Sequence, residues 1–538
     1  LSIFLRVVYA FAREMHPKTT DVFIEYGTAG FRTKASLLEH VVYRMGLLAV
    51  IRSRCKNGRT IGIMITASHN LEPDNGVKLI DCDGEMLEQS WEEIATRLAN
   101  VSDNDLESTT GQIIKEVDAN MALKASVFIG MDTRYTSPRL AAAAVHGVMA
   151  LKGTAKEFGI MTTPQLHYCV KCRNDNSYGT PTEEGYYEKI VGAFKKVRQN
   201  LPIFGEYNTT LYVDGANGVG GKKLNIIKKS LGGELDLNLF NLGGNGGKLN
   251  LNCGADFVKV SQTPPVGVQH VPSQRVASLD GDGDRIVYYY IDDKEQMHLL
   301  DGDRIATLLA SFITELLKTC GATDLKLGLV QTAYANGAST KYITDQLKIP
   351  VTCVKTGVKH LHHAALTYDI GVYFEANGHG TVVYSQHAKN TIKQRKAAQL
   401  LLNFIDMTNE TVGDAISDLF LVETVLCARG HDIRQWHEAY VDYPCRQLKV
   451  TVQDRNAITT TDAERKCTSP EGLQTKIDEL VSTYTAGRAF VRPSGTEDII
   501  RVYAEADTKQ CADKLAAEVA QAVFDLAGGV GDRPSLPA

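Results

Sequence analysis

The sequence predicts an α/β protein of four domains: three related α/β domains followed by a smaller C-terminal α+β domain. Three observations support this prediction. A chain of 538 residues is long enough for roughly three to four domains. One unit, a short apolar strand followed by a small polar loop and a helix, recurs at wide spacing, which is typical of related α/β domains. From about Leu448 the pattern changes to strand-like segments before one final helix.

Linker-like stretches near Gly205, Gly302 and Gly430 suggest where the domains meet, because glycine interrupts regular elements. We therefore predict domains at 1–204, 205–301, 302–430 and 431–538.

The first domain begins with a glycine turn and a helix. Gly27 to Arg32 carries two glycines beside a threonine and an arginine, a composition that suits either a phosphate contact or a plain turn. Apolar residues at helical spacing then run from Leu37 to Leu48, and Asn57-Gly58 is a suitable end for that helix. The apolar run Ile61 to Ile65 predicts a short buried strand.

The rest of the first domain follows the same logic. Val77 to Leu87 predicts a hairpin that turns at Asp83-Gly84. Ser90 and Glu93 have capping-box spacing and predict the start of a helix. Val127 to Gly130 predicts a strand that precedes an alanine-rich helix.

The strand–loop–helix unit returns twice. Leu211 to Val213 precedes a lysine-rich helix, and Leu327 to Val330 precedes another helix. In the C-terminal domain we expect a hairpin over Arg488 to Ala506 and a final helix over Lys509 to Leu526.

Composition sets limits on location and partners. Hydrophobic residues make up 43% and charged residues 22%, which is ordinary for a globular protein, and a net charge of −5 gives no electrostatic footprint for nucleic acid. The 11 cysteines, an odd number, favour reduced thiols and a cytoplasmic protein. The pair Cys169 and Cys172 lacks a second pair at zinc spacing. We expect no nucleic-acid or membrane partner, and a monomer.

The N-terminal segment has two interpretations. Leu1 to Phe11 is apolar apart from Ser2 and Arg6, which favours an amphipathic helix. Ala10-Phe11-Ala12 resembles a cleavage site, so a targeting signal is the alternative, although no basic region precedes it.

Ser68 is the first candidate catalytic residue. It lies in Thr66-Ala67-Ser68-His69-Asn70, where the strand Ile61 to Ile65 opens into a loop. That edge of an α/β sheet is where ligands bind, and a serine hydroxyl there suits a nucleophile. An ordinary turn is the alternative.

The stretch from Asp280 to Arg285 is the strongest candidate metal site. Asp280, Asp282 and Asp284 alternate with two glycines, so three like charges crowd one loop unless a cation lies among them. Oxygen ligands suit Mg²⁺ or Ca²⁺. An EF-hand is excluded, because its sixth and twelfth positions would fall on Arg285 and Ile291. A solvated acidic turn is the alternative.

Two further loops are candidate substrate sites. Arg492 to Asp498, with Arg501 on the returning strand, offers guanidinium groups, hydroxyls and backbone N–H groups for a phosphate. Glu375 to Gly380 follows a strand and offers a carboxylate and an amide for sugar hydroxyls. Each could equally be a polar turn. Four basic residues lie nearby in the sequence: Lys359, His360, His362 and His363. We expect their side chains to be exposed or to face a substrate rather than to bind a metal.

No phosphate-binding loop of the Walker type and no dinucleotide G-x-G-x-x-G after a strand is present in the sequence. The four polar loops, in this order, resemble the motifs of the α-D-phosphohexomutases, and the resemblance covers about Gly27 to Ala506. The segment Asn70 to Lys78, Asn377 in the third loop and Gly185-Tyr186-Tyr187 resemble the eukaryotic phosphoacetylglucosamine mutase branch.

The resemblance implies four domains around a central cleft, each carrying one motif. It implies that Ser68 carries a phosphoryl group, that Mg²⁺ bridges it to the three aspartates, and that a sugar 1,6-bisphosphate forms as the intermediate. The implied reaction interconverts N-acetylglucosamine 6-phosphate and 1-phosphate, in UDP-N-acetylglucosamine biosynthesis. The implied substrate contacts are Glu375, Ala376, Asn377, Gly378 and His379 for the sugar, and Arg492, Pro493, Ser494, Gly495, Thr496 and Arg501 for the phosphate.

Several alternatives stay open at this point. Arg32, His69 and Lys359 are all candidates for the group that handles the proton of the attacking hydroxyl. The enzyme could prefer glucose or mannose phosphates, or act as a serine-dependent phosphatase. A sugar-phosphate sensor is the non-enzymatic alternative.

Overall fold

The computed structural model describes residues 14–244, 246–494 and 498–535. Their contacts divide the chain into two compact units. The first unit comprises 1–301, 377–381 and 397–433, and the second comprises 302–376, 382–396 and 434–538. The predicted N-terminal helix at Leu1 to Phe11 lies outside the described residues. The four domain borders stay a prediction.

The first sheet of the first unit has five strands in the order β1-β3-β2-β4-β5. β2, β4 and β5 are parallel, whereas β3 is antiparallel to both β2 and β1. Every residue of β2 is buried, as its continuous apolar run predicts. The strand bounds are Phe31–Lys34 for β1, Ile61–Ile65 for β2, Asp74–Ile80 for β3, Ser126–Met131 for β4 and Thr154–Ile160 for β5.

Helices cover both faces of this sheet. One face packs its isoleucines against α2, α3, α4 and α5 in a single hydrophobic core. The other face is covered by α6, where a Cβ on Gly62 would lie 3.0 Å from the side chain of Val170. The helix bounds are Glu39–Cys55 for α2, Gln89–Asn100 for α3, Leu106–Glu116 for α4, Ser137–Ala150 for α5 and Thr163–Asn174 for α6.

The second sheet of the first unit repeats the first. Its order is β10-β9-β8-β6-β7. β8, β6 and β7 are parallel, β9 is antiparallel to β8, and β10 is antiparallel to β9. The strand bounds are Thr210–Asp214 for β6, Asp236–Phe240 for β7, Val276–Leu279 for β8, Ile286–Ile291 for β9 and Met297–Leu300 for β10. The other helices of this unit are α7 (Glu183–Arg198), α8 (Val219–Ile227), α9 (Ala255–Ser261), α14 (Gln399–Met407) and α15 (Ala415–Arg429).

The second unit contains a third sheet of the same kind, ordered β12-β11-β13-β14. β11 is parallel to both β12 and β13. The bounds are Leu327–Thr332 for β11, Val351–Val354 for β12, Ile370–Phe374 for β13 and Gly380–Tyr384 for β14, with helices α10 (Gly302–Cys320), α11 (Gly337–Lys341), η3 (Tyr342–Leu347), α12 (Val358–Ala365), α13 (Gln386–Lys393) and α16 (Ile433–His437).

The three sheets place their loops in equivalent positions. The Ser68 loop joins β2 to β3, the Asp280 loop joins β8 to β9, and the Glu375 loop joins β13 to β14. In each sheet the loop leaves the last of the consecutive parallel strands and leads to the adjacent strand. The predicted strand–loop–helix repeat is confirmed separately, because β4, β6 and β11 each lead through a short loop into a helix, namely α5, α8 and α11.

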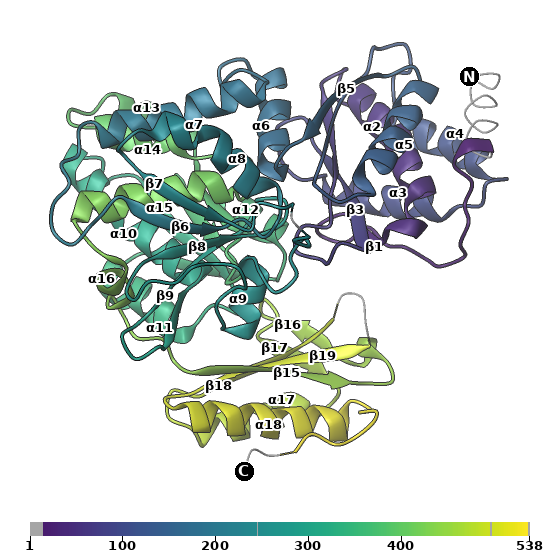
Figure 1. The fold of residues 1–538 in the computed structure, drawn as a ribbon. Helices are drawn as coiled ribbons and strands as arrows, with labels where there is room; N and C mark the ends of the chain where they lie inside the picture. Colours follow the sequence, from purple (N-terminus) through teal and green to yellow (C-terminus); the bar gives the residue numbers. More distant parts are fainter. Residues whose placement is uncertain (1–13, 245, 495–497, 536–538) are drawn as a thin grey trace. The chain divides into compact units, whose positions relative to one another are not determined.

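The C-terminal sheet is smaller, with the antiparallel order β15-β19-β18, and α18 packs along one face of it (Figure 1). A two-stranded sheet, β16-β17, and α17 complete this part. The bounds are Cys445–Thr451 for β15, Thr459–Thr461 for β16, Lys466–Ser469 for β17, Arg488–Pro493 for β18, Ile499–Glu505 for β19, Leu473–Ser482 for α17 and Lys509–Leu526 for α18. The predicted fold class is confirmed.

One predicted detail is wrong. α3 begins at Gln89, but no side chain caps its first turn, and the hydroxyl of Ser90 donates to Glu88 instead of forming a capping box with Glu93. None of the helices among the described residues combines the length and the apolar character needed to cross a membrane. All eleven cysteines are free thiols.

Candidate active site

Ser68 is fully buried in the loop after β2 and has a left-handed backbone conformation, with φ of +49°. Its hydroxyl donates a hydrogen bond to Oδ2 of Asp280 over 2.7 Å. Its N–H donates to the hydroxyl of Thr66 over 2.9 Å. A non-glycine residue in this conformation stores strain that surrounding contacts must sustain, and such residues concentrate at functional sites.

The backbone of the serine loop is fixed from two sides. Nδ2 of Asn250 donates to the carbonyl oxygens of Ser68 and Asn70 over 2.8 and 3.0 Å. The guanidinium of Arg134 donates to the same two carbonyls over 3.3 and 2.6 Å. A Cβ on Gly281 would lie 2.6 Å from the carbonyl oxygen of Ser68, so only glycine fits where the metal loop meets the serine loop. The serine loop is therefore held by residues from loops that follow strands of both sheets: Arg134 after β4, Asn250 after β7 and Gly281 after β8.

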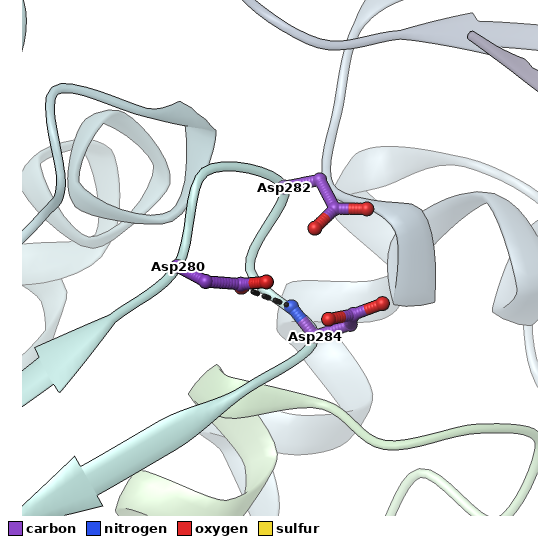
Figure 2. Close-up of side chains that lie close together, drawn as sticks. All are labelled: Asp280, Asp282 and Asp284. Atoms are coloured by element: carbon purple, nitrogen blue, oxygen red, sulfur yellow. Dashed lines mark hydrogen bonds between the residues drawn. The ribbon is translucent and has the colours of Figure 1, made fainter. Parts of the chain in front are cut away.

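The predicted metal loop brings its three carboxylates together (Figure 2). Asp280, Asp282 and Asp284 are buried, and one ligand atom from each lies within 4.8 Å of the others. Oδ1 of Asp280 accepts the backbone N–H groups of residues 283, 284 and 285 over 3.0–3.2 Å. The loop thus folds around one of its own carboxylates while it keeps the three carboxylates clustered.

These carboxylates fit a hard divalent cation. Burial and the charges of Asp284 and Asp282 raise the pKa of Asp280 well above its usual range. Burial opposes ionisation of Asp284, but His379 and Lys78 outweigh burial and hold its pKa well below its usual range. Oδ1 of Asp282 and Oδ1 of Asp284 accept no hydrogen bond from the described residues. Buried oxygens of this kind are the ligands that Mg²⁺ prefers.

Two helix N-termini support the loop. The hydroxyl of Thr163, the first residue of α6, donates to Oδ2 of Asp282 over 2.5 Å, and its N–H donates to the carbonyl of Asp282 over 3.0 Å. The N–H of Ala415, the first residue of α15, donates to the carbonyl of Gly283 over 3.1 Å. Helix N-termini carry partial positive charge, so both favour the acidic loop.

Lys78 is a site residue that the sequence analysis did not single out. Its Nζ lies 3.6 Å from Oδ2 of Asp282 and 3.4 Å from Oδ2 of Asp284. It projects from β3, and its side chain is only 11% exposed. The signal was a lysine within a mostly buried strand, opposite Met64 of β2.

Two of the three candidate proton-handling groups lie beside the metal loop. The charge of Arg285, burial and the charge of Arg32 lower the pKa of His69 to about 2, so its imidazole is neutral. Burial and the charge of Arg285 lower the pKa of Arg32. The negative charges of the metal loop act against this and raise the pKa of both His69 and Arg32, but by less. Such a weakly basic imidazole is a poor proton acceptor near neutral pH.

The third motif is divided between the two units. Residues 377–381 belong to the first unit, where Nδ1 of His379 lies 2.8 Å from the carbonyl oxygen of Asp284 and 3.5 Å from its carboxylate. The carbonyl of Gly378 accepts the N–H of Ile286 over 3.1 Å. A Cβ on Gly378 would lie only 1.9 Å from the carbonyl oxygen of Ile286. The third motif therefore packs against the metal loop and stabilises it. Its contact with sugar stays a prediction.

In the second unit, Oε1 of Glu375 accepts the N–H of Gly357 over 3.3 Å, and the carbonyl of Ala376 accepts the N–H of Gly302 over 3.4 Å. Lys359 is buried on α12. His362 is also buried, with Nδ1 3.1 Å from the hydroxyl of Tyr373, so it is not one of the exposed side chains that the sequence suggested.

The fourth motif brings cations together across the C-terminal sheet. Arg492 of β18 lies directly opposite Arg501 of β19, and Arg501 lies opposite Lys449 of β15. Directly opposite residues share a face, and like charges there destabilise a sheet unless an anion lies between them. Ser494 is buried, and its N–H donates to the carbonyl of Ile499 over 2.8 Å.

Pro493 ends β18 opposite Ile500. Gly495 and Thr496 lie outside the described residues. Lys449 is the residue of this face that the sequence analysis missed, because only strand register brings it beside Arg501.

Family models match most of the chain. Two are described as phosphoacetylglucosamine mutase AMG1 domains II and III and match residues 177–287 and 301–431. Two are described as phosphoglucomutase/phosphomannomutase domains: the α/β/α domain I, at residues 37–105 and 99–177, and the C-terminal domain, at 448–522.

Whole-chain relatives agree with these models. The phosphoacetylglucosamine mutases of Sus scrofa and Homo sapiens are each 52% identical, over 96% and 97% of this chain and 97% of theirs. An Aspergillus fumigatus N-acetylphosphoglucosamine mutase structure has a TM-score of 0.94 at 47% identity, covering 98% of this chain and 99% of its own.

Two further structures were solved with ligands. One is the Aspergillus fumigatus enzyme with GlcNAc-6P and magnesium (TM-score 0.93, 47% identity, covering 97% of this chain and 99% of its own). The other is a substrate complex of N-acetylglucosamine-phosphate mutase, described as a member of the α-D-phosphohexomutase superfamily (TM-score 0.93, 43% identity, covering 96% and 99%). With the serine loop and the aspartate loop in direct contact, these likenesses show that the chain belongs to the phosphoacetylglucosamine mutase family of that superfamily.

Proposed function

We propose that this chain interconverts N-acetylglucosamine 6-phosphate and N-acetylglucosamine 1-phosphate, using Ser68 as the phosphoryl carrier. The observation that carries the proposal is the 2.7 Å hydrogen bond between the buried Ser68 hydroxyl and Asp280 of the carboxylate cluster. The relative solved with GlcNAc-6P and magnesium supports this substrate and this metal. A related enzyme carrying a serine-to-alanine substitution was solved with glucose 1,6-bisphosphate, which supports a bisphosphate intermediate.

Each half-reaction moves one phosphoryl group. Phosphorylated Ser68 gives its phosphoryl group to the free hydroxyl of the sugar monophosphate; the bond from phosphorus to the serine oxygen breaks as the bond to the sugar oxygen forms. The resulting 1,6-bisphosphate turns around and returns its other phosphoryl group to Ser68. Mg²⁺ held by Asp280, Asp282 and Asp284 would offset charge on the transferring group.

We propose that the residues of the third and fourth motifs bind substrate. Glu375 and Asn377 would accept sugar hydroxyls, with Ala376, Gly378 and His379 shaping their loop. Arg492, Ser494 and Arg501 would bind the phosphate that is not transferred, together with Pro493, Gly495 and Thr496. Arg492 and Arg501 lie opposite each other on one face of the sheet, so both guanidinium groups can donate to one phosphate, which supports this role.

The attacking hydroxyl must also lose its proton. Arg32, His69 and Lys359 remain the proposed candidates, and the low pKa of His69 counts against that residue as a base. Lys78 joins them as a cation beside the carboxylate cluster.

A coupled assay of 1-phosphate formation tests the function. Run on acetylated and plain hexose 6-phosphates, it distinguishes the proposed activity from a phosphoglucomutase or phosphomannomutase. Measuring inorganic phosphate in the same samples distinguishes a phosphatase. We expect 1-phosphate from the acetylated substrate and no stoichiometric phosphate release; preference for a plain hexose would contradict the proposal.

We also propose a cytoplasmic monomer without a nucleic-acid partner. Eleven free thiols support a reducing compartment, and the net charge of −5 gives nucleic acid no electrostatic footprint. Sedimentation of the purified chain and imaging of the tagged protein test these points.

A further inference from the structure

One carboxylate of the second unit, that of Glu464, bonds to two separate segments at once. Its Oε1 accepts Nε–H of Arg492 over 3.0 Å. Its Oε2 accepts both the N–H and the hydroxyl of Thr356, over 2.9 and 2.6 Å. The Glu464 side chain is 14% exposed and that of Arg492 is 20% exposed, so water competes little for these bonds. Glu464 therefore links Arg492 of β18 to the turn that precedes α12.

The connection continues into the third motif. Gly357, the residue after Thr356, donates its N–H to Oε1 of Glu375 over 3.3 Å. A continuous path of hydrogen bonds and one peptide link thus runs from Arg492 to Glu375. Both ends are proposed substrate contacts, one for phosphate and one for sugar.

Glu464 lies in the tight turn that joins β16 to β17. Asp462, Ala463 and Glu464 all have left-handed conformations, with φ of +51°, +55° and +68°. Three consecutive non-glycine residues of this kind persist only where surrounding contacts over-determine them. Arg465 supplies one such contact, because its N–H donates to the carbonyl of Asp462 over 3.1 Å and its guanidinium donates to the Asp462 carboxylate over 2.5 Å.

An acidic residue beside a phosphate site would ordinarily weaken anion binding. Here its hydrogen bond goes to Nε of Arg492 rather than to a terminal guanidinium nitrogen, and the terminal nitrogens are the atoms suited to pair with a phosphate. It also offsets the repulsion between Arg492 and Arg501, which face each other in register. Burial opposes the charge on Arg492, but Glu464 and Tyr334 outweigh it and raise its pKa, so the guanidinium stays charged.

We infer that Glu464 is a positioning residue that sets the phosphate-binding arginine and the sugar-binding loop in register with each other. This inference rests on the proposed function of Arg492 and Glu375. Glu464 itself touches neither substrate nor metal in this scheme. Losing it should release Arg492 and the Thr356 turn together.

The test is a double-mutant cycle. Glu464→Ala should raise KM for N-acetylglucosamine 6-phosphate about tenfold, because Arg492 loses one charge-assisted bond that orients it. In an Arg492→Ala background the same substitution should raise KM by much less. Glu464→Gln has one acceptor oxygen for two sets of donors and should fall between wild type and Glu464→Ala. Glu471→Ala, at an exposed glutamate of the same domain, is the matched control.

A second measurement separates the two halves of the link. Inorganic phosphate, tested as a competitive inhibitor, probes the phosphate half alone. Glu464→Ala should weaken its inhibition about tenfold, whereas Thr356→Val, which removes only the hydroxyl on the sugar side, should leave phosphate inhibition unchanged and still raise KM. A role in folding alone would shift the thermal unfolding midpoint without this split.

Independent, additive effects of Glu464→Ala and Arg492→Ala would overturn the inference, as would unchanged KM and phosphate inhibition in Glu464→Ala. Failure of the proposed function would look different, since wild type and Glu471→Ala would then form no 1-phosphate. In that case phosphate binding by the same variants, measured by calorimetry, still decides whether Glu464 acts through Arg492.

Discussion

Replacing Thr163 with valine tests how the metal loop is held. Valine keeps the shape of threonine but removes the hydroxyl that donates to Oδ2 of Asp282 over 2.5 Å. Oδ1 of Asp282 has no hydrogen-bond donor among the described residues, and Nζ of Lys78 stands 3.6 Å from Oδ2. The substitution therefore removes the side-chain hydrogen bond that orients this carboxylate.

The magnitude follows from that geometry. A hydrogen bond to a charged group contributes about 1.5–3 kcal/mol, which corresponds to roughly 10- to 100-fold in an equilibrium constant. Loss of a residue that orients a metal ligand typically weakens metal affinity by roughly the same factor. We expect Thr163→Val to weaken Mg²⁺ binding about 10- to 100-fold. High Mg²⁺ concentrations should restore most of the activity.

Thr110→Val is the matched control. Thr110 lies buried in α4, and its hydroxyl has no hydrogen-bond partner among the residues that the structure describes. Titrations of activity and calorimetry with Mg²⁺ should separate the two variants clearly. If Thr163→Val bound Mg²⁺ as tightly as Thr110→Val does, the hydroxyl would not orient Asp282 and the reasoning would be refuted.

Three further predictions follow from the site. Ser68→Ala should lose nearly all turnover while its circular dichroism and unfolding midpoint stay unchanged, and active wild-type enzyme should show phosphoserine at this position by peptide mass; its absence at every stage would contradict the carrier role. Chelation should abolish activity reversibly, and Asp282→Asn should weaken Mg²⁺ binding because one charge leaves the cluster; full activity in metal-free enzyme would exclude the scheme. Arg492→Ala should lower kcat/KM about 10- to 100-fold through the lost phosphate contact, with Ser68 phosphorylation and Mg²⁺ affinity kept; lost Mg²⁺ binding with normal substrate kinetics would disprove the assignment.

The sequence was most informative where one short segment carries a complete signal. The apolar run before Ser68, the alternating aspartates after β8 and the final helix were all recognisable from local spacing. Their relation in space was not, because the bond from Ser68 to Asp280 spans 212 residues. Only resemblance to a known family connected those two motifs in advance.

Other site residues could not be found locally because they act through the fold. Thr163 resembles any threonine at the start of a helix, and only the packing of α6 brings it to Asp282. Lys78 is one lysine in a strand until the register of β3 places it beside the carboxylates. The predicted capping box had the correct local spacing but did not form, because the hydroxyl of Ser90 donates to the side chain of Glu88 instead.

The anchoring of the serine loop has a consequence for dividing the chain. A fragment ending at residue 204 would keep β2 and Ser68 but lose Asn250, which holds the serine carbonyl, and Asp280, which accepts the serine hydroxyl. The left-handed backbone at Ser68 would then lack much of the support that sustains its strain. We therefore expect Ser68 to carry a phosphoryl group only in a chain that contains both the first and the second sheet. A fragment with the first sheet alone should not be phosphorylated at Ser68.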